Sequence, residues 1–186
     1  MGTRGKRNKK VNVFEEPTLL SDVNKIKELA TEKGMYNGEA LDIEQLIQEI
    51  SHREENAPIL IKKIPMDNYL SGSLSYKDGM WIMTVNSKQH PKRQRFTLAH
   101  ELAHYILHKE KIGDNLTDNA MYRSKLSNVF ERQANILASE ILMPVNFVMQ
   151  FIEENKSVSE MASLFKVSEG AMRIRLRQGG DIFLAE

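Results

Sequence analysis

Two histidines four residues apart, His100 and His104, stand in the segment RFTLAHELAHYILH, with Glu101 directly after the first of them. In a helix, side chains at positions i and i+4 lie on one face with Cβ atoms about 5–6 Å apart, so both imidazoles can reach one ion. The ion expected from this ligand pair is zinc. Glu101 can reach a metal-bound water without binding the ion itself, which is the position of the general base in a HExxH peptidase.

The alternative interpretation is a pair of satisfied core histidines. Neither Gly nor Pro occurs between Arg95 and Glu110, and most residues around the motif are apolar or good helix formers, so a buried helix is expected. Two imidazoles and a carboxylate on such a helix would be costly to bury without partners, and a metal ion supplies one. The pattern therefore favours a metal site.

Composition limits the ligand types and the setting. The 186 residues include no cysteine, so a metal must be held by His, Asp or Glu, and a reducing cytoplasm is the expected location. With 26 basic and 25 acidic residues, the net charge of +1 gives no global argument for binding nucleic acid or membranes. No apolar run has signal-peptide length or approaches the roughly 20 residues of a membrane span. We expect a soluble protein with one main domain and no membrane contact.

The first elements follow from composition and helical spacing. Residues 1–16 are polar and basic, which predicts a disordered tail, with a contact arm for an acidic partner as the alternative. Apolar residues at helical spacing predict one helix over 19–33, ended by Gly34, and a second helix that follows Asp42.

The middle of the chain changes to strand-like patterns. Three strands are predicted over 59–64, 69–76 and 81–85, and Lys77-Asp78-Gly79 is a hairpin turn signal between the last two. We expect these strands to form a small antiparallel sheet. The basic, polar segment 86–94 is predicted to be a loop leading to the metal helix, from which it could contact a protein substrate.

A second long helix offers the candidates for a third ligand. Residues 109–128 predict a loop or a partly helical flap, and apolar spacing over 129–143 predicts a helix that Pro144 ends. A catalytic zinc site needs three protein ligands and an open position for water, so an acidic residue on a neighbouring helix is required. Glu131 and Glu140 are both candidates, and their separation of about two and a half turns means that only one faces the metal.

The segments RFTLAHELAHYILH and ERQANILASEILMP together resemble the ImmA/IrrE-type metallopeptidases of bacteria and their mobile elements. That family pairs a HExxH helix with a second helix bearing E-x-x-A-N-x-x-A-x-x-L-L-M-P. The segment LSGSLSYKDGMWIMTVN resembles the family's hairpin, so the resemblance spans residues 40–150. It implies that His100, His104 and Glu131 bind Zn²⁺, with Mn²⁺ as an alternative, and that Glu101 is the base. Ala103 departs from the family's frequent Gly, but Ala is also small and suits a helix.

The fold class implied is α+β, with a small three-stranded antiparallel sheet packed on a zincin-like HExxH helix and a second, ligand-bearing helix. The mechanism implied is that of a gluzincin-like endopeptidase, in which a second group helps to stabilise the oxyanion. Spacing leaves Tyr76, Tyr105 and His108 open for that role. We expect His108 to lie at the helix end or to contact a ligand, and we expect Asn135, one turn after Glu131, to support a ligand too.

Three short helices are predicted after Pro144, over 145–154, 158–165 and 169–177, and the last two resemble a helix-turn-helix. Their expected N-caps are Ser157 and Ser168. These two helices are expected to pack through Ala162, Phe165, Ala171, Ile174 and Leu176.

A helical cap that completes the domain is favoured over DNA binding for this segment. The second helix offers only Ser168 and Glu169 near its start, which are few side chains for reading bases. DNA binding would instead depend on four cations, Lys166, Arg173, Arg175 and Arg177.

The predicted organisation is a basic tail over 1–16, a metallopeptidase domain over 17–150 and a helical, helix-turn-helix-like segment over 151–186. By resemblance, we expect a zinc-dependent endopeptidase that cleaves a partner helix-turn-helix repressor and so derepresses a mobile-element, toxin–antitoxin or stress-response operon. The alternative is a DNA- or repressor-binding regulator, or a toxin–antitoxin component, with a structural metal and no proteolysis. A structural zinc site normally closes with four protein ligands, which argues against the alternative.

Overall fold

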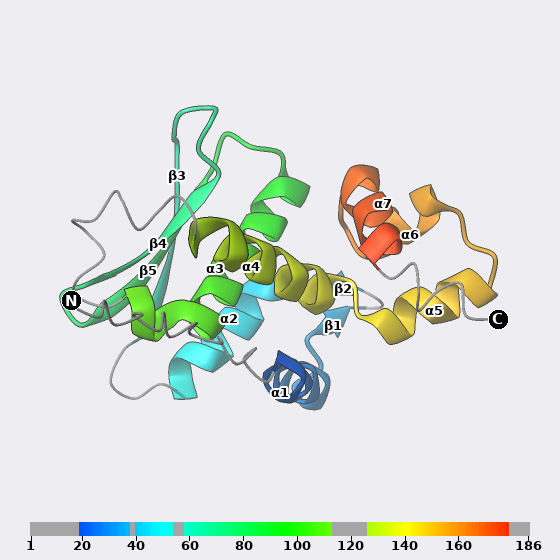
Figure 1. Ribbon diagram of the computed structural model, residues 1–186, viewed down its shortest axis with the longest axis horizontal. Coiled ribbons are helices and arrows are strands. Elements are labelled where there is room, and N and C mark those ends of the chain that lie inside the picture. The colour runs from blue at the N-terminus through cyan, green and yellow to red at the C-terminus, as the bar shows by residue number, and fades with distance from the viewer. Residues whose placement is uncertain (1–18, 38–39, 54–57, 113–125, 179–186) are drawn as a thin grey trace, which may run out of the picture.

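The computed structural model describes residues 19–37, 40–53, 58–112 and 126–178 (Figure 1). The tail predicted over 1–16 and residues 113–125 of the predicted flap lie outside the described residues. The fold is α+β, as predicted. Its elements in chain order are α1 (Leu19–Glu32), β1 (Tyr36–Asn37), β2 (Ala40–Leu41), α2 (Ile43–Arg53), β3 (Ile59–Ile64), β4 (Gly72–Lys77), β5 (Met80–Asn86), α3 (Pro91–Ile112), α4 (Leu126–Leu142), α5 (Val145–Glu153), α6 (Val158–Leu164) and α7 (Glu169–Gln178).

The larger sheet lies at one end of the molecule and α6 and α7 lie at the other, with α3 and α4 between them (Figure 1). The two central helices pack closely because alanines face one another at their contact: Ala99 and Ala103 on α3 and Ala134 and Ala138 on α4 are fully buried. These two successive helices are thereby held side by side, and both carry predicted site residues.

The larger sheet has the order β3-β5-β4, and its strands are mixed in direction. Strand β4 is antiparallel to β5, joined to it by a tight turn in which Asp78 (φ 53°) and Gly79 (φ 78°) take the positive φ angles of a hairpin turn. Strand β3 is parallel to β5, with Ile59 opposite Trp81. The prediction of a purely antiparallel sheet is therefore wrong.

The parallel pairing follows from which strand occupies the centre. Strand β5 alternates buried and partly buried side chains and ends in a buried residue, so it is covered best between two neighbours. The short connection 65–71 can only turn the chain back on itself, which makes β3 antiparallel to β4 and hence parallel to β5. Asn86, which is completely buried, fixes this connection: its side-chain amide donates to the carbonyls of Asp67 (3.1 Å) and Leu70 (2.8 Å).

Helix α3 begins at Pro91, four residues earlier than predicted. Proline suits the first position of a helix because its missing N–H would have no partner there. The backbone N–H of Lys92 donates to His90 Nδ1 at 3.2 Å, so His90 caps this end of the helix. Much of the predicted basic loop 86–94 is therefore the first turn of the helix that carries the HExxH motif.

Helix α4 begins at Leu126, three residues earlier than predicted, and Pro144 lies between α4 and α5 as expected.

No single helix among the described residues has the length and apolar character needed to cross a membrane. The residues Asn128–Leu142 and Val145–Glu153 pass that test of length and composition only as a pair, across a bend of 56°.

The C-terminal helices are capped as predicted. Ser157 and Glu160 form a reciprocal capping box at α6, and Ser168 Oγ accepts from the backbone N–H of Ala171 at 3.1 Å. The predicted packing of Ile174 is wrong, because its side chain is 55% exposed. Met172 is buried in its place, since it lies on the same face of α7 as Arg175, which is also buried.

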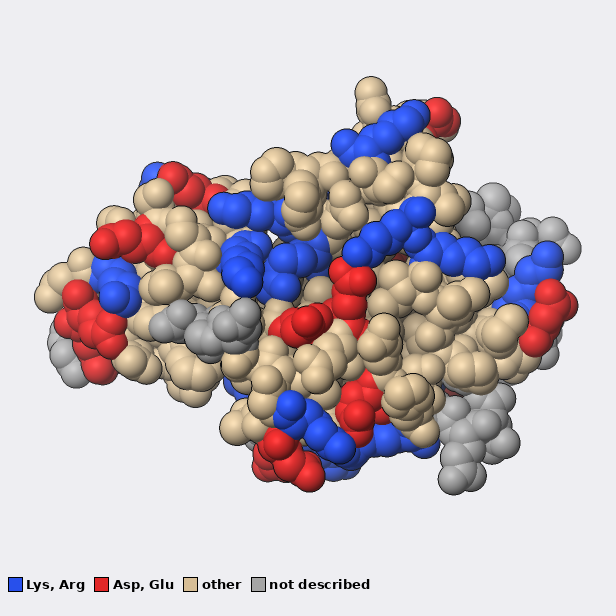
Figure 2. All heavy atoms as spheres, turned by 180° about the vertical axis from the view of Figure 1, so that it is seen from behind, with Lys and Arg blue, Asp and Glu red and all other residues tan. Residues whose placement is uncertain are grey.

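The surface carries charges of both signs. From behind, Lys and Arg side chains gather across the middle of the face, and acidic side chains lie below them (Figure 2). This mixture is consistent with the near-neutral net charge.

Candidate metal centre

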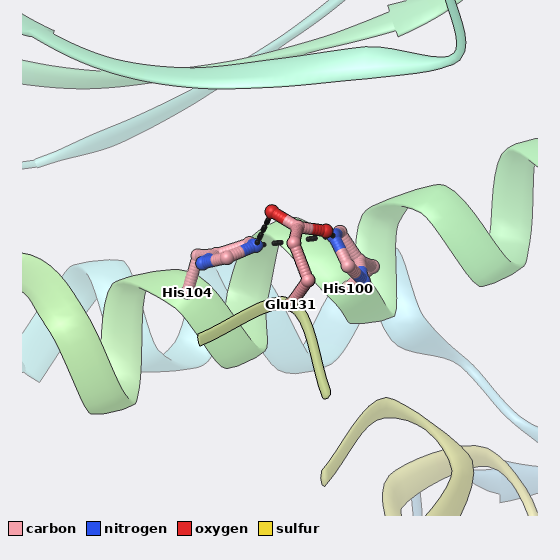
Figure 3. Close-up of side chains that lie close together, drawn as sticks. All are labelled: His100, His104 and Glu131. Atoms are coloured by element: carbon pink, nitrogen blue, oxygen red, sulfur yellow. Dashed lines mark hydrogen bonds and ion pairs between the residues drawn. The ribbon is translucent and has the colours of Figure 1, made fainter. Parts of the chain in front are cut away.

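Helices α3 and α4 bring His100, His104 and Glu131 together, with one potential ligand atom of each within 4.8 Å of the others (Figure 3). The Nε2 atoms of the two histidines are 3.1 Å apart. One carboxylate oxygen of Glu131 is 3.2 Å from His100 Nε2, and the other is 3.2 Å from His104 Nε2.

Glu140, the other acidic candidate on α4, lies at the opposite end of that helix. Its carboxylate forms ion pairs with Lys27 of α1 and Arg175 of α7, and it also accepts from the backbone N–H of Val145 at 3.3 Å. Of the two glutamates that the spacing left open, only Glu131 therefore joins the histidines.

Asn135 orients the first histidine. Its Oδ1 lies 3.1 Å from His100 Nδ1, and an amide oxygen can only accept, so Nδ1 carries the proton. The lone pair of His100 is then on Nε2, which faces His104 and Glu131. Asn135 therefore contacts one of the two histidines of the cluster.

A two-step relay orients the second histidine. Gln133 Oε1 lies 3.1 Å from His108 Nε2 and accepts a hydrogen bond from it. His108 Nε2 therefore carries the proton, and His108 Nδ1 has the lone pair. His104 Nδ1, 3.0 Å from that atom, donates to it. The lone pair of His104 is thus also on Nε2 and points into the cluster. His108 thus contacts a histidine of the cluster, and Gln133 is a participant that the sequence alone did not indicate.

The electrostatics of the cluster suit a cation. Burial, reinforced by the neighbouring His100 and His108, lowers the pKa of His104 to about 3. Burial also lowers the pKa of His100, against the opposing influence of the Glu131 carboxylate. Two neutral imidazoles therefore direct lone pairs toward one carboxylate, with no proton at the centre. Two imidazole nitrogens and a carboxylate are a donor set that Zn²⁺ accepts, and in catalytic sites it leaves a further position open.

Glu101 lies on the same helix and is 7% exposed. Burial, with a smaller contribution from the nearby Glu131 carboxylate, raises the pKa of Glu101 to about 8. A cation held beside it would favour the ionised form and lower this pKa again. The side chain can therefore exchange a proton near neutral pH.

Gly72, at the start of β4, allows the sheet to lie against this part of α3. A Cβ atom at residue 72 would overlap the side chain of Thr97, would lie 2.6 Å from the carbonyl oxygen of Thr84, and would be 3.4 Å from Glu101 Oε1. Any other residue would push the strand away from Glu101. The sequence indicates this close approach, because Gly72 lies inside a predicted strand, where glycine often marks a place at which another part of the backbone comes near.

The two tyrosines considered for the oxyanion role have different surroundings. Tyr105 is 2% exposed, and its ring packs edge-on against Trp81 with centroids 5.4 Å apart. Tyr76 is 39% exposed and lines the cleft that contains the cluster, and its ring centroid lies 5.0 Å from that of Trp81. Tyr76 is thus the tyrosine open to a bound molecule.

The cluster lies in a cleft of about 2380 Å³. Its walls are β4 with the preceding segment, α3, α4 and the first turns of α7. Strand β4 is at the edge of the sheet, so one row of its backbone groups has no strand partner within the part of the chain that the structure describes. The cleft therefore places a free strand edge beside the His and Glu cluster, with the strands passing over it (Figure 3).

The four cations considered for DNA binding do not form one exposed group. Arg175 is 7% exposed, pairs with Glu140, and donates from Nε to the carbonyl of Met143 at 3.0 Å. Arg173 is paired with Glu169 at 3.3 Å, within α7. Lys166 and Arg177 are exposed. Arg175 is thus occupied in holding α7 onto α4 and is not available to a phosphate.

Comparison with known proteins gives one family and several relatives. The family model Peptidase_M78, described as the IrrE N-terminal-like domain, matches residues 54–177, roughly two thirds of the chain. The radiation response metalloprotease IrrE of Deinococcus radiodurans is 34% identical over 108 residues, which cover 51% of this chain and 32% of that protein. Its counterpart in Deinococcus deserti is 33% identical over 95 residues, covering 47% and 32%. The chain thus matches about a third of the length of these curated relatives.

Among solved structures, a chain described as a Mycobacterium tuberculosis transcriptional regulator superposes with a TM-score of 0.58. The superposition covers 84% of this chain and 46% of that chain, at 16% sequence identity. At this identity the similarity is one of fold.

Proposed function

Because the chain belongs to the Peptidase_M78 family, the IrrE N-terminal-like domain, we propose that it is a zinc-dependent endopeptidase that hydrolyses a protein substrate in the cleft between β4 and α4. One observation carries the proposal: His100 and His104 direct Nε2 lone pairs at the Glu131 carboxylate, and the buried Glu101 lies one residue from His100. A structural role alone gives no reason for a buried carboxyl with a pKa raised to about 8 beside such a cluster.

His100, His104 and Glu131 would hold the ion. When bound, zinc supplies Lewis acidity, which lowers the pKa of water and polarises a carbonyl group. Asn135 and the His108–Gln133 pair keep the imidazoles in the tautomer that presents Nε2. The chain's own contribution is therefore a preset arrangement of acceptors that needs no rearrangement.

Glu101 moves the proton. Its carboxylate accepts a proton from the attacking water, and the resulting carboxylic acid donates that proton to the amine nitrogen as the peptide bond breaks. A carboxyl whose pKa lies near the working pH serves both directions of this transfer, and burial of Glu101 keeps bulk water from competing for the proton.

The substrate chain would lie along β4. An extended peptide can pair with the free edge of this strand through backbone hydrogen bonds, which fixes its position without demanding a particular sequence. Tyr76 extends into the same cleft from β4, and its hydroxyl is the candidate for a hydrogen bond to the developing oxyanion. The other candidate, His108, is 3% exposed and engaged with His104 and Gln133.

We further propose that the substrate is a helix-turn-helix repressor, so that cleavage derepresses the operon it controls. Two of the relatives are named radiation response metalloproteases, which links members of this family to a stress response. A DNA- or repressor-binding regulator without proteolysis is the rival function, and it would need the exposed cations of the C-terminal helices.

The test is proteolysis of a purified repressor encoded beside this protein, with Zn²⁺ or Mn²⁺ added. Glu101→Gln is expected to lower the rate by roughly 10²–10⁴-fold, the usual contribution of a general base, while a chelator stops the reaction. Glu110→Gln, an exposed glutamate on the same helix, is the matched control and should cleave at the wild-type rate. Cleavage that survives Glu101→Gln would overturn the mechanism. Retention of operator DNA without any cleavage would support the rival function.

A further inference from the structure

The cleft continues beyond the His and Glu cluster to the C-terminal helices. Ser168, Gly170, Ala171 and Ile174, all from the first turns of α7 or the residue before it, line the same cleft as the cluster. One face of α7 is therefore turned toward the site where a peptide would be cut.

Exposed apolar side chains gather in this cleft. The described residues include nine large apolar side chains that are exposed, and five of them line the cleft: Tyr69, Leu70, Tyr76, Ile136 and Ile174. Ile136 is 37% exposed and Ile174 is 55% exposed. Exposed apolar groups that collect in one hollow indicate a surface that is covered by a bound molecule.

Each of the two isoleucines lies close along its helix to the ion pair that joins α4 and α7. Arg175, next to Ile174, pairs with Glu140, and Glu140 lies one turn after Ile136 on α4. This ion pair, together with the hydrogen bond from Arg175 to the Met143 carbonyl, holds α7 at a fixed distance from α4. The subsite between them is thus preformed.

The spacing from the cluster fits a neighbouring residue of a bound peptide. Ile136 follows Glu131 by five residues, about 7.5 Å along the axis of α4. An extended chain advances about 3.3 Å per residue, so this distance corresponds to about two residues from the peptide bond that is cut.

Charge favours one kind of occupant. Among the described residues that line the cleft, the only acidic side chains are Glu101 and Glu131, whereas Lys92, Arg93 and Arg132 are all basic. The Arg93 guanidinium has no carboxylate partner among the described residues and donates to Ser71 Oγ, at 3.1 Å. The cleft therefore suits a segment with apolar and acidic side chains and disfavours a basic one.

We propose that Ile136 and Ile174 form a specificity subsite for an apolar side chain, about two residues from the cleaved bond of an extended, non-basic substrate segment. The inference rests on the proposed peptidase function. It gives the C-terminal helices a role in selecting the peptide, because α7 forms the far wall of the subsite.

The test uses internally quenched fluorescent decapeptides, in sets that place Leu, Ser, Asp or Lys at one fixed position, with the zinc-loaded full chain. The wild-type protein is expected to prefer Leu at one position near the cleaved bond. Ile174→Ala and Ile136→Ala should each lower kcat/KM about tenfold for the Leu peptides and leave that for the Ser peptides unchanged, since only the apolar contact is lost. Leu60→Ala on β3, an equally exposed apolar residue outside the cleft, should change neither value.

The outcomes separate this inference from the proposed function. Cleavage that depends on Glu101 but keeps the same Leu preference in both isoleucine variants overturns the subsite alone. If the wild-type protein cuts none of the peptides, the repressor assay above decides on the peptidase function. Binding of the same peptides to zinc-loaded Glu101→Gln protein, followed by fluorescence anisotropy, then decides on the subsite. Loss of Leu-peptide binding in a Glu101→Gln, Ile174→Ala protein upholds it. Equal binding, or none by either protein, overturns it.

Discussion

The two ends of α4 hold glutamates in opposite circumstances. Glu140 is 16% exposed in its side chain, and the chain supplies its cations, Lys27 from α1 and Arg175 from α7. The Glu131 side chain is 54% exposed and faces two histidines that burial keeps neutral. Lysine and arginine side chains of the chain itself neutralise the Glu140 carboxylate. The Glu131 carboxylate has neutral imidazoles beside it, so a bound metal ion would have to supply its positive charge.

This difference separates a stability role from a binding role on one helix. A carboxylate with fixed partners has the same role with or without a metal ion, and removal of that carboxylate leaves its cations without compensation. A carboxylate beside neutral imidazoles contributes only when an ion is present. The contrast can be tested by substitutions at each end.

The largest effect is expected for zinc-dependent stability at the Glu131 end. Zinc at about a thousand times its dissociation constant should raise the free energy of unfolding of the wild-type protein by about 4 kcal/mol. Glu131→Gln should lose most of this increment, while its metal-free stability stays near the wild-type value. Urea unfolding with and without zinc measures both. Equal increments in the two proteins would contradict the ligand role of Glu131.

At the other end, Glu140→Gln should lower the free energy of unfolding by about 3 kcal/mol with or without zinc, because Arg175 is left buried without its counter-charge. The zinc increment itself should remain. The double variant Glu140→Gln, Arg175→Met is the control and should recover part of the loss, since no unpaired guanidinium remains. A zinc increment that disappears in Glu140→Gln would break the contrast between the two ends.

A pH dependence should distinguish the buried carboxyl near the cluster. Glu101 is protonated in the folded and unfolded chains below about pH 4.5, but its pKa is raised to about 8 only in the folded chain. The unfolded chain therefore ionises first, and the stability contributed by the protonated form is lost as pH rises toward 8. Metal-free Glu101→Gln should gain stability over the wild type as the pH rises from 5 to 8, by at most about 1.4 kcal/mol per pH unit.

The measurement is the difference in unfolding free energy between the two metal-free proteins at each pH. His100 and His104 titrate in both proteins, so their contribution largely cancels in the difference. A difference that does not change with pH would show that Glu101 is ionised in the folded chain throughout this range.

The smallest effect is expected at Asn135, one turn from Glu131. Asn135→Ala removes the acceptor that keeps the His100 proton on Nδ1, and zinc affinity should fall about tenfold. Competition with a fluorescent zinc chelator measures this change. Gln48→Ala, an exposed amide on α2, should have no effect. Unchanged affinity in Asn135→Ala would mean that the tautomer of His100 is fixed in another way.

Features that depend only on the local spacing of residues could be predicted from the sequence. The i, i+4 separation of His100 and His104 needs only a helix to bring both rings to one face. Spacing alone could not decide whether Glu131 or Glu140 faces the histidines, because that depends on how the two helices pack. The resemblance to the metallopeptidase family implied Glu131, and the Peptidase_M78 match confirms that resemblance. Gln133 was missed because its role depends on a ring contact between His104 and His108 that spacing does not specify.

The errors arose where distant parts of the chain decide the outcome. The direction of β3 depends on β5 taking the central position, which no single strand pattern reveals. The prediction that Ile174 is buried was wrong because Arg175 occupies the buried face of α7 instead. Arginine is rarely buried without a partner, and the partner of Arg175, Glu140, lies on another helix. The predicted start of α3 is four residues too late. A proline in a polar segment indicates a loop, but proline is also common at the first position of a helix, as Pro91 is here.

The mixed sheet also sets an order in which its contacts can form. Every residue pair between β4 and β5 joins positions 3 to 13 residues apart, from Lys77 with Met80 to Gly72 with Val85, so this hairpin closes only short loops. Every pair between β3 and β5 joins positions 22 apart, as in Ile59 with Trp81. Longer loops cost more entropy to close, so the hairpin has the kinetic advantage and β3 docks onto it afterwards. The strand that borders the cleft thus belongs to the part of the sheet that can assemble first.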